Sequence, residues 1–298
     1  MDDLKRNLLS LVDWLENAPM PSSFESKDAL MTFFVEEVMS RTLYVLRVGV
    51  SLAPNETVAK RGYTKHRAVI VGHLVRLTKL YDAFCLHVAK NEFEIAGIFN
   101  RLIFETELRI SYFLASKQKS RALRSYIFTS FRSERDSLID LTEKKKRRTL
   151  IPIERRMIRS MMRDLREDGI TFKKLRKNKA WKVDGKDTRA MLKSLGREWE
   201  YSYGFGGASR WIHGGWLELK RFHLRKKRGF YEPRLEYGMP DLRVAAPTTI
   251  LVLEVLLKFL KWNKSDPKSL LTPIVTGINK LALEVDMDHE NRLQDGST

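Results

Sequence analysis

Apolar residues return every three or four positions along most of this 298-residue chain, and this period predicts amphipathic α-helices. Proline, glycine and short polar turns separate the periodic stretches, and such residues end helices. The expected helices are 2–17, 27–51, 63–89, 92–116, 119–145, 153–167, 187–203, 208–213, 244–262 and 267–285. The stretch 169–185 is typical of a loop. The sequence therefore predicts an all-α protein, a multi-helix bundle with a small hairpin or an ordered loop near residues 216–237.

Short connections and the distribution of charge indicate how the bundle is organised. Only a polar turn around Lys90 and Asn91 separates the third and fourth helices, and so short a connection implies that these helices run antiparallel. We expect a single helical domain over residues 1–298, with a basic helical insertion at about 117–190. The polar tail after residue 286 is expected to fray.

The composition is that of a folded chain without membrane insertion. Hydrophobic residues make up 43% of the sequence, which excludes a wholly disordered chain. The N-terminus begins acidic and lacks the basic and apolar regions of a secretory signal. The longest apolar stretch, 248–262, is too short to span a bilayer and contains charged residues. The single cysteine, Cys85, cannot form an intramolecular disulfide, and together these features predict a cytoplasmic protein.

Positive charge is concentrated in one quarter of the chain. The sequence has 55 Lys and Arg against 37 Asp and Glu, a net charge of +18. Residues 117–189 contain 24 basic and 10 acidic residues and carry +14 of that total. Such a bias raises the local concentration of anions and favours polyphosphate partners. The candidate nucleic-acid-binding residues are Lys144, Lys145, Lys146, Arg147, Arg148, Arg155, Arg159, Arg163, Lys173 and Lys174.

The spacing of the arginines in this region favours one basic helix face. Positions 155, 159, 163 and 166 share a face, where they could follow a phosphate backbone or pair with acidic groups of a partner. A merely solvated face is the alternative, and both stay open. Phe172 and Trp181 flank the nearby lysines and could stack on unpaired bases or anchor the segment to the core. A second basic patch, 220–228, has a similar mixture of cations and rings.

The helix expected at 92–116 carries charged residues although most of its surface is apolar. Arg101 and Glu105 are four residues apart and therefore share a face. If this helix is central, they must pair with each other or with neighbouring helices, because an unpaired buried charge is costly. Two interpretations stay open, namely a structural ion pair and a polar pocket inside the bundle.

A second candidate constellation lies in the glycine-rich stretch 201–215. Ser209 and His213 are four residues apart on an expected short helix, and Arg210 lies on an overlapping face. Histidine exchanges protons near neutral pH, and arginine can hold a phosphate or a developing negative charge. Serine could bind substrate or cap the helix. The alternative for His213 is a packed residue or a contact with the helix C-terminus.

These two constellations carry a resemblance to a known family. Residues 91–105 read Asn-Glu-Phe-Glu-Ile-Ala-Gly-Ile-Phe-Asn-Arg-Leu-Ile-Phe-Glu, and a Ser-x-x-x-His motif and a closing helical pair follow a hundred residues later. This arrangement resembles a family of uncharacterised bacterial helical proteins, a domain of unknown function. The family combines Arg-x-x-x-Glu on one helix with a later Tyr-rich segment that ends in Ser-x-x-x-His. The resemblance implies Arg101, Glu105, Ser209 and His213 as the matching residues, and Phe205 stands where the family usually has a tyrosine.

The family's all-helical layout is similar in turn to HEPN domains, which often act as metal-independent ribonucleases in toxin and phage-defence systems. Their signature is an arginine followed, after four to six residues, by a histidine. His213 departs from it, because glycine and alanine occupy the required positions 206–208. Two other matches exist, Arg61 with His66 and Arg67 with His73, but about 1.75 matches are expected by chance at this composition. The HEPN resemblance is therefore an analogy of fold.

Our leading hypothesis is a helical protein that binds nucleic acid, RNA in particular, through residues 117–189. The resemblance extends it to a metal-independent ribonuclease of a toxin or phage-defence system. In that extension His213 is the general acid or base, Arg210 or Arg101 holds phosphate, and Glu105 orients one of them. One rival is a non-catalytic component of such a system that docks an acidic protein or nucleic acid through its basic face. Another is a small-molecule pocket around Arg101 and Glu105.

No cofactor and no metal are expected. The sequence lacks the phosphate-cradling Gly-x-x-x-x-Gly-Lys motif, and its six histidines do not cluster with carboxylates at zinc-ligand spacing. The expected partners are nucleic acid, RNA in particular, or an acidic protein, without a membrane, and an oligomer is compatible with the sequence.

Overall fold

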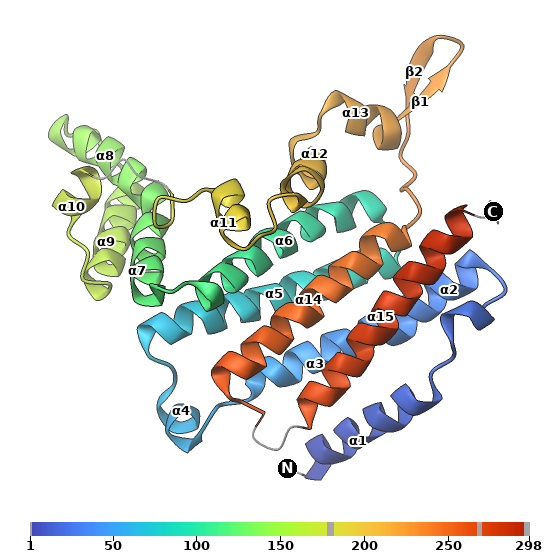
Figure 1. The fold of residues 1–298 in the computed structure, drawn as a ribbon. Helices are drawn as coiled ribbons and strands as arrows, with labels where there is room; N and C mark the ends of the chain where they lie inside the picture. The colour runs from blue at the N-terminus through green and yellow to red at the C-terminus, as the bar shows by residue number, and fades with distance from the viewer. Residues whose placement is uncertain (1, 178–181, 267–269, 295–298) are drawn as a thin grey trace. The chain divides into compact units, whose positions relative to one another are not determined.

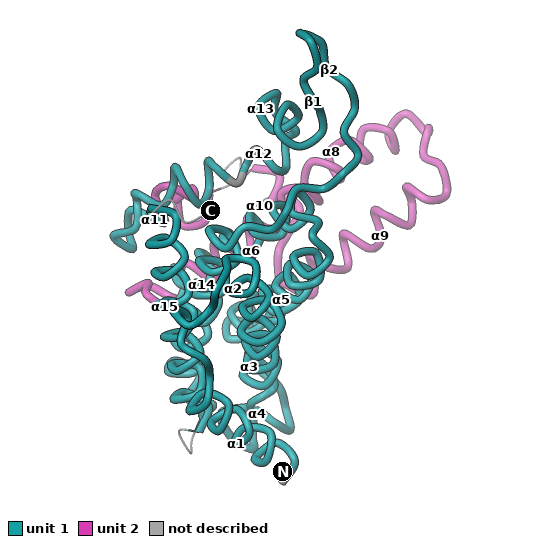
Figure 2. Tube along the Cα trace, turned by 90° about the vertical axis from the view of Figure 1, so that its right-hand side faces the viewer, with its two compact units in different colours: residues 1–114, 192–298 teal, residues 115–191 magenta. Residues whose placement is uncertain are grey.

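The computed structural model describes residues 2–177, 182–266 and 270–294. Contacts within the chain divide it into two compact units, which Figure 2 shows in separate colours. Unit 1 comprises Met1–Leu114 with Leu192–Thr298, and unit 2 comprises Ala115–Met191. Helices dominate both units, and the described residues of unit 1 add one two-stranded antiparallel hairpin. The predicted all-α class with a small hairpin is therefore confirmed.

Unit 1 is a bundle of long helices (Figure 1). Helices α14 and α15 pack along each other, and α3 packs against both of them and against α5. Large side chains such as Phe34, Tyr81, Phe113 and Phe259 are fully buried in its core. The elements of the bundle are α1 (Asp2–Asn17), η1 (Pro21–Ser23), α2 (Lys27–Phe33), η2 (Phe34–Met39), α3 (Ser40–Ser51), α4 (Glu56–Arg61), α5 (Lys65–Ala89), α6 (Phe93–Ala115), α14 (Leu242–Asn263) and α15 (Leu271–Gln294).

The helix predicted at 27–51 is confirmed as the continuous run α2, η2 and α3. Ser26 begins it, because its hydroxyl accepts a hydrogen bond from the backbone N–H of Ala29 at 3.1 Å. The middle segment, η2, is a π-helix that buries Phe34, Val38 and Met39. The extra residue in the π-helical turn is compatible with an unbroken helix axis.

Helices α5 and α6 run antiparallel, as their short connection predicted. Asn91 adopts a left-handed backbone conformation in the turn, with φ of 58°. Two ring contacts then join the helices in opposite chain directions. His87 stacks on Phe99 with ring centroids 5.3 Å apart, and His73 lies 6.0 Å from Phe113.

The expectation that the chain frays after residue 286 is wrong for the residues described, because α15 continues to Gln294. His289 is buried in this last part of the helix. Arg292 forms an ion pair with Asp288 at 2.6 Å and donates a hydrogen bond to the carbonyl of Pro21 at 3.2 Å. The burial of His289, the ion pair within α15 and the hydrogen bond to Pro21 stabilise turns that look freely solvated in the sequence.

Residues 188–233 form short elements on unit 1, apart from the start of α11, which belongs to unit 2. The helix predicted at 187–203 is too long, because α11 ends at Ser194. Gly196 adopts a left-handed φ of 72°, and the Arg197 N–H donates to the carbonyl of Leu192 at 2.9 Å, which is the Schellman ending of a helix. The elements are α11 (Thr188–Ser194), the π-helix η3 (Tyr201–Gly207), α12 (Ala208–His213), α13 (Trp216–Glu218), the π-helix η4 (Leu219–His223), β1 (Leu224–Lys227) and β2 (Phe230–Pro233).

Unit 2 has a small core of its own. Leu138, Leu165 and Leu175 are buried there, and Phe131 and Phe172 pack against them. This packing explains two corrections to the prediction: the helix expected at 119–145 is interrupted at Phe131, and the loop expected at 169–185 contains a helix. The helices of the unit are α7 (Lys119–Ser130), α8 (Arg132–Lys146), α9 (Pro152–Glu167) and α10 (Phe172–Lys177). Within the described ranges, no helix of either unit is long and apolar enough to cross a membrane.

Candidate functional site

Helix α6 and the π-helix η3 meet at Arg101. The guanidinium of Arg101 is 2.9 Å from Glu105 and lies over the ring of Phe205, 3.3 Å from its centroid. Only 5% of the Arg101 side chain is exposed, and burial lowers its pKa although Glu105 acts in the opposite direction. Its Nε and Nη1 groups have no hydrogen-bond partner among the described residues. The arrangement is an ion pair with unused donor capacity, in which Glu105 remains 28% exposed.

Two glycines allow this close approach. A Cβ atom on Gly97 of α6 would lie 2.6 Å from the indole of Trp211, and one on Gly204 of η3 would lie 2.5 Å from the ring of Phe104. Both distances are shorter than side chains tolerate, so only glycine fits at these positions. Gly204, in the 201–215 stretch, therefore serves packing against α6.

The contacts that residues 205–211 make with α6 show where the predicted site residues lie relative to one another. Phe205 lies on Arg101, whereas Trp211 lies on Gly97 and meets the edge of Phe93 at 5.3 Å. The chain therefore runs along α6 toward its N-terminus. Phe93 is eight residues before Arg101, a rise of roughly 12 Å.

Arg101 and Glu105 are thus brought together, and the Ser-x-x-x-His motif lies next to them only in part. Ser209 donates its hydroxyl hydrogen to the carbonyl of Phe205 at 2.7 Å, which ties it to the residue above Arg101. His213 lies beyond Trp211, away from Glu105. It is exposed and makes no hydrogen bond or ion pair within the described part of the chain. The side chain of Arg210 lies outside what the structure describes.

A buried charge network that we did not predict joins α6 to the segment before η3. Arg197 contacts both oxygens of Glu107, at 2.8 and 3.1 Å, and both oxygens of Glu200, each at 2.6 Å. Ser111 also donates to Glu107 at 2.6 Å. Burial alone would lower the pKa of Arg197, but the hydrogen bonds to the two carboxylates raise it overall. A glutamate inside the apolar stripe of α6 was the available signal, although its partner is 90 residues away.

A second unpredicted pair lies before the hairpin. Glu218 is buried, and its Oε1 lies 2.8 Å from Nε2 of His223, whose side chain is 47% exposed. The other oxygen, Oε2, is buried without a hydrogen-bond partner in the described ranges. A carboxylate on one ring nitrogen fixes the orientation of an imidazole and leaves the other nitrogen available. The sequence analysis noted His223 only as part of the basic patch 220–228 and did not single out Glu218, five residues before it.

Of the two HEPN-type matches in the sequence, the pair Arg67 and His73 takes part in packing, whereas Arg61 is exposed. Arg67 donates to Asn263 at 2.6 Å and lies over the ring of Trp262, 4.5 Å from its centroid. These contacts attach α5 to the end of α14. His73 is buried, and this burial, followed by the charges of Arg109 and Arg76, lowers its pKa to about 4.

The ten candidate nucleic-acid-binding residues are all exposed on unit 2. Some of their charge is neutralised locally: Lys144 pairs with Glu154 at 2.6 Å, and Arg163 lies 3.5 and 3.9 Å from two carboxylates. Arg155 and Arg159 form no ion pair with any described residue. Phe172 packs against the core of unit 2, so the anchoring interpretation holds for it. Trp181 lies outside the described residues.

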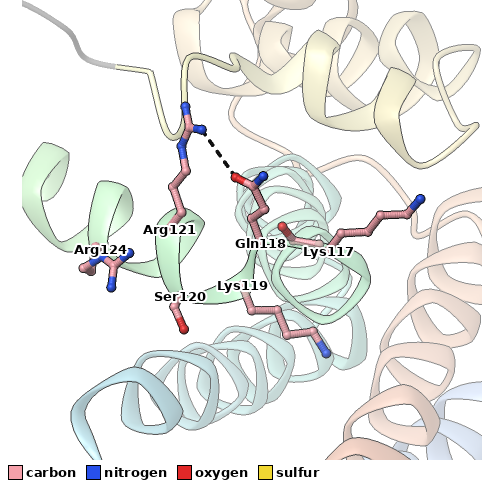
Figure 3. Close-up of a pocket in the computed structure, with 7 residues that line it drawn as sticks. Lys117, Gln118, Lys119, Ser120, Arg121 and Arg124 are labelled. Carbon is pink, nitrogen blue, oxygen red and sulfur yellow. Dashed lines mark hydrogen bonds between the residues drawn. The ribbon is translucent and has the colours of Figure 1, made fainter.

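An open pocket of about 690 Å³ adds to the cationic surface of unit 2 (Figure 3). Arg121 donates to Gln118 at 3.3 Å and pairs with Asp184 at 2.8 Å. The labelled cations extend in different directions and do not converge on one point. The pocket therefore resembles a charged surface more than a built ligand site. It is lined by Ser116, Lys117, Gln118, Lys119, Ser120, Arg121 and Arg124.

Comparison with known proteins gives one match. A family model described as a family of unknown function, DUF5677, matches residues 67–230, which is more than half of the chain and includes Arg101, Glu105, Ser209 and His213. No curated protein and no solved structure matches the chain. Among the described residues, no three His, Cys, Asp or Glu side chains come together as a metal site requires.

Proposed function

We propose that this chain, which belongs to the family of unknown function DUF5677, binds nucleic acid, and RNA in particular, through the cationic surface of unit 2. The observation that carries the proposal is the exposed charge of Arg155 and Arg159 on α9, which no described carboxylate neutralises. Ile158, Met161 and Met162 turn one side of this helix toward the core. Arg155 and Arg159 lie on another side, exposed and without ion pairs among the described residues. Cations that no internal carboxylate neutralises attract phosphate groups.

The salt dependence of RNA binding tests this proposal. We expect the binding constant of a labelled RNA to fall steeply and linearly with salt on a logarithmic scale, because phosphate contacts release counterions. The double variant R155E/R159E should weaken binding about tenfold or more and reduce that slope. The matched control K60E/R61E makes the same charge change on α4 of unit 1 and should have little effect. Absence of binding by the wild-type protein at low salt would end the proposal.

A finer form of the proposal is a metal-independent ribonuclease of a toxin or phage-defence system. In such a reaction an imidazole takes the proton of a ribose 2′-hydroxyl, and O2′ attacks the adjacent phosphorus. The bond from phosphorus to O5′ breaks, a 2′,3′-cyclic phosphate forms, and O5′ takes up a proton. The Nε and Nη1 atoms of Arg101, which have no hydrogen-bond partner among the described residues, support a phosphate-holding role for this residue.

Two histidines compete for the proton-transfer role. His213 is the histidine that the family motif implies. It follows Trp211, which contacts α6 at Phe93, so the chain carries it away from Arg101 and Glu105. His223 is the one whose ring is oriented by a buried carboxylate, that of Glu218. We expect RNA cleavage in the presence of a chelator, and its loss with unchanged binding in either H213A or H223A. Cleavage that both variants retain would remove the histidine mechanism.

The rival function is a non-catalytic component of such a system that docks an acidic protein through the same cations. The exposed side chains of unit 2 support it equally well, because carboxylates and phosphates both pair with arginine. The cleavage assay separates the two, since chelator-resistant cleavage that is lost in a histidine variant excludes a purely docking role.

A further inference from the structure

Exposed aromatic rings gather in a part of unit 1 that the proposed function does not use. The side chains of Trp216, Phe230 and Tyr231 are 58%, 79% and 42% exposed. Trp216 meets Tyr231 edge to face with centroids 5.4 Å apart. A water-facing group of large rings of this kind marks an interaction surface. We call Trp216, Phe230, Tyr231 and residues 225–228 the aromatic hairpin.

The register of the hairpin places a lysine directly across from each of its two rings. Lys226 lies opposite Tyr231, and Lys227 lies opposite Phe230. Side chains alternate along a strand, so each of the two faces carries one ring beside one lysine. Arg228 and Gly229 form the tight turn, with φ of 49° and 89°, and Figure 1 shows both strands extending away from the helices of unit 1.

The base of the hairpin is held in place by buried contacts. Phe222 packs on Trp211 with centroids 4.8 Å apart, and Glu218 holds His223 at the residue before β1. On the other side, both carboxylate oxygens of Glu94 accept the N–H of Gly238 at 2.9 Å. The rings are thus presented from a fixed base, which reduces the entropy lost on binding.

We infer that the aromatic hairpin binds an unpaired segment of RNA. Every base has a face that can stack on an aromatic ring, and the neighbouring cations can pair with the phosphates between stacked bases. The strands and their turn carry four cations, Arg225, Lys226, Lys227 and Arg228. Glu232 pairs with Lys227 at 3.3 Å and Glu236 with Arg225 at 3.5 Å, so an excess of two cations has no ion-pair partner among the described residues. That excess disfavours a second copy of this chain as the occupant, because like charges would meet in such an interface. The inference deepens the proposed function, since it takes RNA as the ligand, but it assigns recognition of single strands to unit 1.

Binding of two RNA probes by three variants tests the inference. The probes are a labelled single-stranded oligouridine and a duplex RNA of equal length. W216A/Y231A should weaken binding of the single strand at least tenfold and leave duplex binding unchanged, because only unpaired bases can stack on the rings. W216F/Y231F keeps the rings and should retain the affinity. W199A removes a ring that is 69% exposed between Glu198 and Glu200, and should have no effect.

The outcomes separate this inference from the proposed function. R155E/R159E should weaken binding of both probes, because phosphates are common to both. Equal single-strand affinity of W216A/Y231A and the wild type overturns the inference alone. A wild-type protein that binds neither probe at low salt overturns both. A loss of self-association in W216A/Y231A without loss of RNA affinity identifies the rings as an interface between copies, which also overturns the inference.

Discussion

Burial keeps the imidazole of His73 neutral and the thiol of Cys85 protonated. Both residues lie on α5, where burial lowers the pKa of His73 to about 4 and raises the pKa of Cys85 to about 12. Removal from water disfavours the charged form of either group, so the two shifts have opposite signs and one cause. The same cost applies to Arg101, which keeps a charge that Glu105 balances. These three groups of unit 1 are therefore either neutral or paired, and Arg101 in addition keeps N–H donors without a hydrogen-bond partner among the described residues.

The pKa of His73 predicts a pH dependence of stability. Between pH 6.5, the ordinary value, and about 4, the unfolded chain binds a proton at this position that the folded chain does not. The contribution of His73 to the free energy of unfolding should therefore be complete above pH 6.5. It should decrease by up to about 3 kcal/mol as the pH falls toward 4. Urea unfolding at a series of pH values measures this decrease. H73Q removes the titrating group and should give a shallower profile; parallel profiles would contradict the assignment.

At the scale of elements, η3 and α12 are held on α6 by close packing and by one buried charge network. Gly97 and Gly204 allow the backbones to approach, and Arg197 clamps the preceding segment to Glu107. A π-helix is rare, occurs mostly as a single turn inside an α-helix and is frequent at functional sites. Here η3 places Phe205 over Arg101. The candidate site thus depends on contacts that lie outside its own sequence motifs.

Removal of Arg197 tests this dependence. R197M leaves the carboxylate of Glu107, which is 1% exposed, without its charge partner, and should destabilise unit 1 by about 3–5 kcal/mol. The control R225M changes an arginine that is 59% exposed and should change stability by less than about 0.5 kcal/mol. Chemical denaturation of both variants supplies the comparison. Similar stabilities for the two would show that the network contributes little.

At the scale of the whole molecule, the chain combines a large helical bundle with a smaller, charged unit. Unit 2 has its own buried leucines and carries most of the net charge. Unit 1 contains the ion pair at Arg101 and the aromatic hairpin. The proposed functions follow this division, since phosphate attraction belongs to unit 2 and recognition of unpaired bases to unit 1.

A cavity in the core of unit 2 should affect that unit first. L165A removes a fully buried side chain and should destabilise unit 2 by about 3–5 kcal/mol. Hydrogen exchange followed by mass spectrometry should then accelerate in 119–177, while peptides from α14 and α15 keep their protection. Faster exchange throughout the chain would instead indicate that the two units unfold together.

The sequence by itself determined most of the helices, the hairpin region and the position of the charge. Periodic apolar residues and local capping are properties of neighbouring residues, so 2–17 and 208–213 are helical as predicted, and 27–51 forms one helix through a π-helical turn. The pairing of Arg101 with Glu105 is equally local, because four residues separate them on one helix. The exposure of the lysines and arginines of unit 2 follows from their cost of burial.

Only the tertiary structure decided which distant groups meet. Three contacts depend on residues far away in the chain: Arg197 with Glu107, Trp211 with Gly97, and Phe172 with the core of unit 2. The free energy of these contacts comes from packing and desolvation, which no local pattern contains. For the same reason the shared motif led us to place His213 beside Arg101, whereas the path of the chain along α6 carries His213 away from it. The contact of His223 with Glu218 could not be recognised from the sequence either.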